Sequence, residues 1–176
     1  MYTCEFFIHS LGIVLFTAPL YFMCGLDRSF GNYIVFYITC LLISILACSI
    51  AIASAMIFST PSEALLPVLP ISIPAMLFSG FLVPYENIPN YLQWLYNVSF
   101  FQYGTSIMLI KEFEDKTYVD CQHNITGMCI TTGNDILSKL NINENDIVKD
   151  FIVLSMMTFF AMIVSYISFT INIKKC

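Results

Sequence analysis

Four long apolar segments, separated by polar stretches, dominate the chain. An α-helix rises about 1.5 Å per residue, so about 20 apolar residues cross the roughly 30 Å of hydrocarbon in a bilayer. Four segments reach that length: residues 6–25, 32–58, 64–83 and 151–173. The pattern therefore predicts an all-α membrane protein with four transmembrane helices.

Short polar turns separate the first three segments. Residues 26–31, LDRSFG, predict a tight connection between the first two. Residues 59–63, STPSE, supply Pro61 as a helix breaker and Ser62 as a helix N-cap before the third segment.

A fifth apolar stretch, residues 91–110, is less simple because amides interrupt it. Asn90, Gln93 and Asn97 fall at i, i+3 and i+7 and make one polar stripe on a helix. Aromatic side chains typical of a membrane interface lie between them, at Tyr91, Trp94 and Tyr96. The stretch could be a fifth crossing or an external re-entrant helix. We favour the re-entrant helix, with its amides toward a wet cavity.

Charged side chains are scarce in the apolar segments. The chain has 7 basic and 12 acidic residues, and 12 of these 19 lie in residues 111–150. A charge at the hydrocarbon centre costs roughly 2.5–3.5 kcal/mol, so residues 111–150 are expected to form a loop outside the membrane. The chain shows no basic patch of the kind that binds nucleic acid, so no nucleic-acid partner is expected.

Three features in the second half of the chain favour one orientation. Lys174 and Lys175 follow the last segment, and basic residues beside a span favour the cytoplasm. Asn124 begins an N-glycosylation sequon, which is modified only on the lumenal side. Cys121 and Cys129 lie in the same loop, where an oxidising compartment permits a disulfide. Together they predict an external loop and a cytoplasmic C-terminus, in a plasma membrane or an intracellular organelle membrane.

Catalytic and metal chemistry find little support in the sequence. His123 lies between Cys121 and Cys129, but two cysteines and one histidine without a fourth ligand make a weak zinc site, so no metal is expected. The apolar segments carry no acid pair and no nucleophile–base set. The chain is therefore not expected to be an enzyme.

Small side chains recur on one face of two segments. In lipid, burial of apolar area gives little drive for helix association, so small residues that allow close approach mark packing faces. The second segment carries such a stripe at Ala47, Ala51 and Ala55 and another at Ser49 and Ala53. The last segment carries one at Ser155, Thr158, Ala161, Ser165 and Ser168.

Residues 73–104, IPAMLFSGFLVPYENIPNYLQWLYNVSFFQYG, resemble part of the transmembrane domain of ABCG-type half-transporters. The resemblance is to the C-terminal half of that domain, in the branch of White and the sterol exporters. It rests on the proline-containing segment ending in FSGF, the IPNYLQWL turn and the SFFQYG run after it. Residues 15–26, LFTAPLYFMCGL, and the cysteine-containing loop before the last segment also fit, so the resemblance covers nearly the whole chain.

The resemblance implies an ABC-2 type fold with six spans per protomer, two protomers and a nucleotide-binding domain N-terminal to the spans. The four predicted spans would be the third to the sixth. The chain departs from this pattern, because it has no G-x-x-x-x-G-K-S/T phosphate loop, no LSGGQ-like signature and no first two spans. No cofactor is expected on this chain. ATP and Mg²⁺ would bind a nucleotide-binding domain upstream or on a partner, and the implied partner is a second ABCG-type half-transporter, in a homodimer or a heterodimer.

The resemblance also assigns site residues in the third segment. Leu69, Ile73 and Met76 share one helix face and match positions that face substrate in relatives. An apolar face of this kind suits a bulky hydrophobic cargo, whereas an ion would lose its hydration there. Three prolines predict a kinked helix, either simply bent or compliant during transport: Pro67, Pro70 and Pro74.

Phe81 and Leu82 follow at the external end of the third segment. The resemblance implies that they form a hydrophobic plug, an external gate that closes the cavity by excluding water. Without the resemblance, a lipid-facing or core position explains them equally well. The resemblance also supports a Cys121–Cys129 disulfide, because bridges in the external loop are frequent in relatives.

Two functions fit these residues. The first is the membrane-domain portion of an ATP-driven exporter that moves a lipid, a sterol or another hydrophobic small molecule by alternating access. The second is a truncated, non-transporting membrane protein that associates with full-length partners. Met1 stands almost inside the first segment, which suggests a fragment or a gene model lacking its upstream part. An unrelated channel is disfavoured, because no segment carries a charged ring.

Overall fold

The computed structural model describes residues 2–23, 25, 30–58, 60–80, 88–113, 133, 137, 140, 142 and 146–173. The regular elements among these residues are all helices. They are α1 (Tyr2–Met23), α2 (Phe30–Ile57), α3 (Pro61–Leu65), α4 (Val68–Leu77), the 3₁₀ turn η2 (Asn90–Leu92), α5 (Gln93–Val98), α6 (Phe100–Phe113) and α8 (Ile147–Ile173). The predicted all-α class is confirmed for the described part of the chain.

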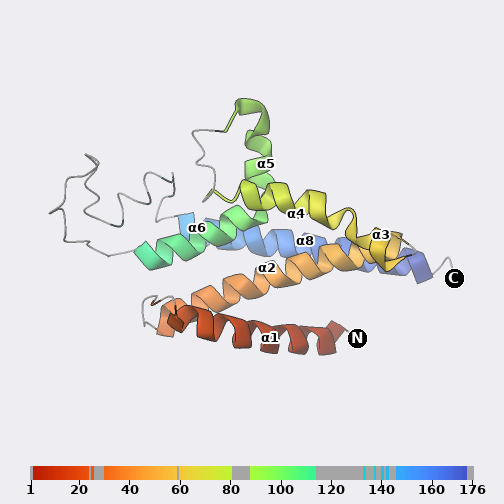
Figure 1. The fold of residues 1–176 in the computed structure, drawn as a ribbon, viewed down its shortest axis with the longest axis horizontal. Helices are drawn as coiled ribbons and strands as arrows, with labels where there is room; N and C mark the ends of the chain where they lie inside the picture. The colour runs from red at the N-terminus through yellow and green to blue at the C-terminus, as the bar shows by residue number, and fades with distance from the viewer. Residues whose placement is uncertain are drawn as a thin grey trace.

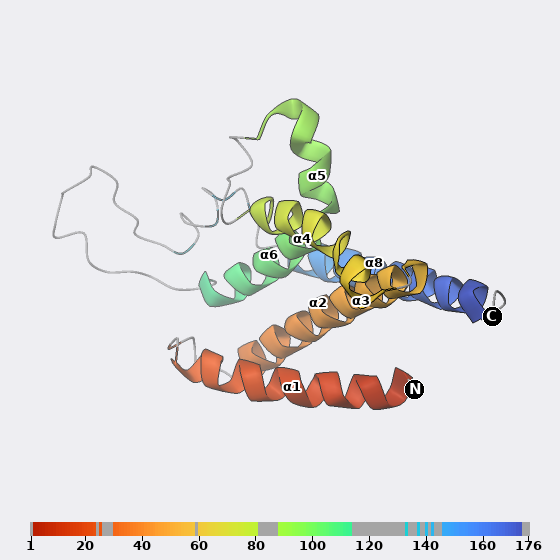
Figure 2. The same ribbon diagram turned by 45° about the vertical axis from the view of Figure 1, so that its right-hand side comes forward.

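α2 is the central helix of the bundle. It packs along α8 and also contacts α1 and α6, and α6 in turn lies against α8 (Figure 1). The beginning of α1 and the end of α8 lie at the same end of the bundle, with α3 near them, in both views (Figure 2). α5 projects away from the long helices beside α4. α4 and α5 therefore lie on the side of the α2–α8 pair opposite α1, whereas α6 packs against both helices of that pair.

Two of the described helices are long and apolar enough to cross a membrane. They are α2 and the α8 stretch Ile147–Ile171, which coincide with the predicted segments 32–58 and 151–173. The apolar stretches Phe7–Met23 and Ser62–Leu77 are shorter. Four crossings with one re-entrant helix remain a prediction.

The outward faces of α1 and α8 are covered with large apolar side chains. Phe7 is 77% exposed and Phe16 is 68% exposed on α1, and Phe160 is 68% exposed on α8. A soluble protein rarely exposes contiguous apolar surface on this scale, whereas hydrocarbon solvates it without cost. These faces agree with a bilayer as the surroundings of the long helices.

The core lies where α2, α6 and α8 meet. Leu46, Phe100, Ile107 and Leu154 form its buried centre. Gly104 of α6 lets the helices approach closely, because a Cβ there would meet Cδ1 of Ile43 at 2.4 Å. The interface is therefore a close contact between helices.

Two buried threonines in this interface bond to carbonyls of their own helices. The Oγ1 of Thr39 donates to the carbonyl of Val35 at 2.9 Å, and the Oγ1 of Thr158 donates to the carbonyl of Leu154 at 2.8 Å. Such back-bonding allows a small polar residue to lie in an apolar contact without an unmet hydrogen bond.

The predicted packing faces are confirmed only in part. Thr158 and Ser165 of α8 and Ser49 of α2 are buried, as the small-residue pattern predicted. Ser155 is exposed, and so is the whole alanine stripe of α2 at Ala47, Ala51 and Ala55. The alanine stripe therefore does not pack against another described helix of this chain.

The third predicted segment is interrupted. α3 ends at Leu65, α4 begins at Val68, and Pro67 stands at the break. Pro74 lies inside α4, where its ring removes a backbone donor. The expected kink is confirmed, and in the structure it takes the form of two short helices.

The predicted N-cap of that segment is wrong. Thr60 is the N-cap, and its Oγ1 accepts from the backbone N–H of Glu63, while Pro61 takes the first helical position. Proline is favoured there because its missing N–H would have no partner in any case. Ser62 therefore lies one residue inside the helix, and Pro61 starts the helix where a breaker was predicted.

The predicted single helix over residues 91–110 is also wrong in detail. The structure has η2, α5 and α6 in succession, and Ser99 separates α5 from α6 in an extended conformation (φ −69°, ψ 110°). α6 then continues to Phe113, three residues beyond the predicted end. Tyr91 and Trp94 are 74% and 62% exposed, so these two aromatic side chains point outward, as a position at a membrane interface requires.

Candidate functional site

α4 exposes the three side chains that the sequence assigned to a substrate cavity. Leu69 is 60% exposed, Ile73 57% and Met76 58%. No residue of α4 is buried. Within the described part of the chain this face is uncovered, so it is available to lipid, to cargo or to another subunit. The structure brings the three residues onto one face and does not show what covers them.

The C-terminal end of α4 is held by the junction between α5 and α6. The Oγ of Ser99 donates a 2.6 Å hydrogen bond to the carbonyl of Ala75, two residues before α4 ends at Leu77. Tyr96 is 7% exposed and packs beside Gly80, where a Cβ would lie 3.2 Å from the tyrosine hydroxyl. Gly80 has φ +81°, a conformation that other residues rarely adopt. The end of α4 and the α5–α6 junction are therefore one packed unit.

The other predicted site residues lie outside the described residues. They are the gate residues Phe81 and Leu82, the cysteines Cys121 and Cys129, and the sequon residue Asn124. Their roles stay predictions. Gly80, which packs against Tyr96, immediately precedes Phe81 in the chain, so this contact lies one residue from the predicted gate.

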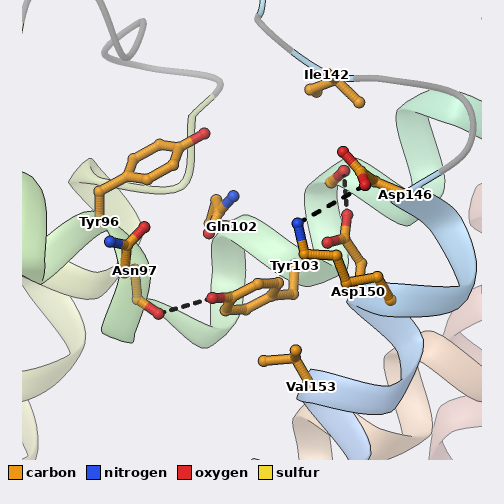
Figure 3. A pocket seen from close by; sticks show the side chains of 10 residues that line it. Tyr96, Asn97, Gln102, Tyr103, Ile142, Asp146, Asp150 and Val153 are labelled. Atoms are coloured by element: carbon orange, nitrogen blue, oxygen red, sulfur yellow. Dashed lines mark hydrogen bonds and ion pairs between the residues drawn. The ribbon is translucent and has the colours of Figure 1, made fainter.

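A polar pocket lies between α5, α6 and the beginning of α8 (Figure 3). Its volume is about 320 Å³. At its centre the Oγ of Ser106 donates a 2.6 Å hydrogen bond to Oδ2 of Asp150, and both side chains are buried. A carboxylate buried in this way is rare unless it is paired or hydrogen-bonded.

Further polar groups surround that pair. The hydroxyl of Tyr103 donates to the carbonyl of Asn97 at 2.8 Å. Lys149 forms an ion pair with Asp146 at 3.7 Å, but its side chain is 71% exposed, so the pair contributes little stability. The Oε1 of Gln102 is buried and has no hydrogen-bond partner among the described residues.

The sequence reasoning missed this pocket. It treated Asp150 as the last charge of the external loop, because the uncharged segment 151–173 begins next to it. A usable signal was present in α6, where Gln102 and Ser106 lie four residues apart and so share one face. The 44-residue separation between Ser106 and Asp150 hid their contact from any local pattern.

The chain matches a known family over most of its described helices. The family model for ABC-2 type transporters matches residues 1–113. The ABC transporter ATP-binding protein/permease wht-1 of Caenorhabditis elegans is 30% identical over 166 residues, which cover 90% of this chain and 25% of that protein. Protein white of Ceratitis capitata is 29% identical over 163 residues, which cover 92% and 24%.

A mammalian relative gives the same result. The broad substrate specificity ATP-binding cassette transporter ABCG2 of Mus musculus is 32% identical over 130 residues, which cover 70% of this chain and 20% of that protein. The chain thus spans about a quarter or less of the length of these relatives. The chain belongs to the ABC-2 type transporter family of membrane domains, and its relatives there are the White and ABCG-type half-transporters that the sequence resembled.

Proposed function

We propose that this chain is the membrane-domain portion of an ATP-driven exporter that moves a lipid, a sterol or another hydrophobic small molecule by alternating access. The observation that carries the proposal is the exposed apolar face of α4, formed by Leu69, Ile73 and Met76. Membership of the ABC-2 type family supports a transporter role, and the face supports the class of cargo.

The chemistry of the α4 face favours an apolar cargo. Two branched aliphatic side chains and one thioether offer dispersion contacts and no hydrogen bonds. A hydrophobic cargo gains about 25 cal/mol for each Å² of apolar surface that leaves water. An ion would lose its hydration on this face and gain no ligand in return.

The break between α3 and α4 supports a role for these helices in a conformational change during transport. Pro67 separates two short helices, and Pro74 removes a backbone donor inside α4. Broken helices are a common device at transporter binding sites, because they bend with little loss of hydrogen bonding. The Ser99–Ala75 hydrogen bond holds the opposite end of α4, so movement would centre on the break at Pro67.

In the complete transporter, other parts would supply the energy for transport and the second set of membrane helices. The 176 residues contain no phosphate-loop motif, so a nucleotide-binding domain, upstream or on a partner, would bind ATP and Mg²⁺. A second ABCG-type half-transporter, identical or different, would face α4 across the cargo path. Phe81 and Leu82 would close that path at the external end, with Asn124 and the Cys121–Cys129 pair in the external loop.

Reconstituted transport tests the proposal. The full-length polypeptide carrying this chain, with its partner and nucleotide-binding domain, is placed in proteoliposomes with a fluorescent sterol or phospholipid. We expect ATP-dependent movement of the probe. Ile73→Ala should weaken the apparent affinity by about 1–2 kcal/mol, or roughly 5–30-fold.

Ile71→Ala is the matched control for that measurement. It removes the same atoms from the same helix at a position that is 50% exposed, but two residues away and so on another face. We expect it to leave the affinity nearly unchanged. Equal effects of the two variants, or no ATP-dependent movement of any hydrophobic probe, would contradict the proposal.

A further inference from the structure

The polar pocket beside α8 has the size of a small-ligand site. Its volume of about 320 Å³ equals that of roughly ten water molecules in the liquid and lies at the lower end of the range for small-molecule pockets. A single metal ion would leave most of that space empty. The described residues contain no group of three or more histidine, cysteine or acidic side chains placed to hold a metal.

Two buried acceptors of the pocket, on Asp150 and Gln102, have hydrogen-bonding capacity that the described residues do not fill. Among the described residues, Ser106 is the one donor to Oδ2 of Asp150, although this carboxylate is only 6% exposed. Oε1 of Gln102 is buried and receives no donor from the described residues. A buried acceptor without a donor is costly, by roughly 1–3 kcal/mol. A ligand that donates N–H or O–H groups would remove that cost.

Charge and ring chemistry narrow the ligand class. Two carboxylates line the pocket against one lysine, and that lysine's side chain is 71% exposed. The rings of Tyr96 and Tyr103 line the same space from the α5–α6 side (Figure 3). Aromatic faces attract cations, and a buried carboxylate favours a positive counter-ion. An anionic ligand would meet two carboxylates.

We propose that this pocket binds a protonated amine, with Asp150 as its counter-ion and Gln102 as a hydrogen-bond acceptor. The amine would belong to a small organic molecule or to a lipid headgroup. A quaternary ammonium would satisfy the charge but donate no hydrogen bond to Gln102. The site is separate from the α4 face, and the inference holds whether or not the chain takes part in transport.

Binding of three matched probes tests the site. Benzylamine, benzyltrimethylammonium and benzyl alcohol share one ring and differ in charge and in hydrogen-bond donors. Binding is measured by calorimetry on the full chain in nanodiscs of phosphatidylcholine alone. We expect benzylamine to bind more tightly than either of the other probes by about tenfold. Equal binding of benzyl alcohol, or no saturable binding of benzylamine at millimolar concentration, would overturn the proposal.

Two variants tie the binding to the named side chains. Asp150→Asn removes the charge and keeps an acceptor for Ser106, and it should weaken benzylamine binding about tenfold or more. Gln102→Leu should weaken it about three- to tenfold by removing the second acceptor. Glu63→Gln, the same kind of acid-to-amide change at an exposed position on α3, should leave it unchanged.

Two further measurements show whether each variant is folded and whether the bound amine comes from a lipid headgroup or from a soluble molecule. Circular dichroism shows whether each variant keeps its helices, and Gln102→Leu still tests the pocket if Asp150→Asn does not fold. Unchanged benzylamine binding in either folded variant overturns the proposal. Nanodiscs containing phosphatidylethanolamine distinguish the sources: competition with benzylamine assigns the site to a lipid headgroup, and its absence assigns it to a soluble amine.

Discussion

The hydroxyl of Ser99 donates a 2.6 Å hydrogen bond to the backbone carbonyl of Ala75, and so joins the α5–α6 junction to the end of α4. Ser99 is 2% exposed, so water does not replace this bond readily. The bond explains two features at once. It satisfies a carbonyl close to the end of α4, and it holds Ser99 in the extended conformation that separates α5 from α6.

Ser99→Ala should therefore destabilise the contact between α4 and the α5–α6 junction. The change leaves the part-buried carbonyl of Ala75 without its donor, which costs about 1–3 kcal/mol. Thermal unfolding in detergent, followed by circular dichroism, measures the loss. Ser72→Ala is the matched control, because the hydroxyl of Ser72 is bonded only to Leu69 in its own helix. Equal unfolding temperatures for the two variants would contradict this account.

Replacing Gly104 with a larger residue should destabilise the protein, because the added Cβ would collide with the Cδ1 methyl group of Ile43. A Cβ at Gly104 would lie 2.4 Å from Cδ1 of Ile43. We expect Gly104→Ala to cost about 1–3 kcal/mol, the usual range for overpacking. Ile43→Val removes that methyl group, so the double variant should recover part of the loss. Gly12→Ala, inside α1 where the new Cβ would meet no described atom within 4 Å beyond its own helix backbone and chain neighbours, should not destabilise the protein.

A failure of that rescue has a clear meaning. If Ile43→Val and Gly104→Ala destabilise the protein additively, the two residues are not in contact and the packing of α6 against α2 differs from the structure. A double-mutant cycle by chemical denaturation in mild detergent gives the coupling energy directly.

Phe81→Ala should open the external gate in a complete transporter. The phenyl ring is proposed to exclude water from the outer end of the cargo path. Its removal should raise passive leak of the cargo or basal ATPase activity in proteoliposomes. Phe159→Ala is a suitable control, because Phe159 is 62% exposed on α8. Leak that is unchanged in Phe81→Ala would remove the gate assignment.

Asn124→Gln should abolish one glycan. The prediction follows from an external loop at residues 111–150. The protein expressed in eukaryotic cells should lose a glycan-sized mobility shift on a gel, and treatment with an endoglycosidase should remove the shift from the wild type. Asn97 begins a second sequon, which we expect to lie too near the membrane to be modified. If Asn97→Gln abolishes the shift and Asn124→Gln does not, the predicted external placement of residues 111–150 is wrong.

The sequence predicted the parts of the fold that depend on continuous apolar length. α2 and α8 lie within four residues of their predicted ends, because a long apolar run without charge forms a helix almost wherever it occurs. The interruption near Pro67 was also predictable, since proline acts on its own helix.

The parts that were missed depend on partners far along the chain. Ser99 ends α5 because it bonds Ala75, which is 24 positions away. Ser106 and Asp150 define the polar pocket across 44 positions. The N-cap error is of another kind, because Thr60 and Ser62 both suit a cap and the sequence alone did not choose between them. Local sequence patterns therefore predicted the long helices, whereas the polar pocket could be found only from the folded structure.

Cysteine accessibility of α5 tests the central claim most directly. That claim is the proposed hydrophobic path along α4, closed at its external end by Phe81 and Leu82, with α5 on the same external side. Single cysteines are introduced at Asn97 on α5 and at Ser62 on α3 in the full-length transporter, and both positions are exposed. A membrane-impermeant maleimide applied to intact cells should label Asn97→Cys and should label Ser62→Cys only after permeabilisation. Labelling of Asn97→Cys only from the cytosolic side would contradict the account.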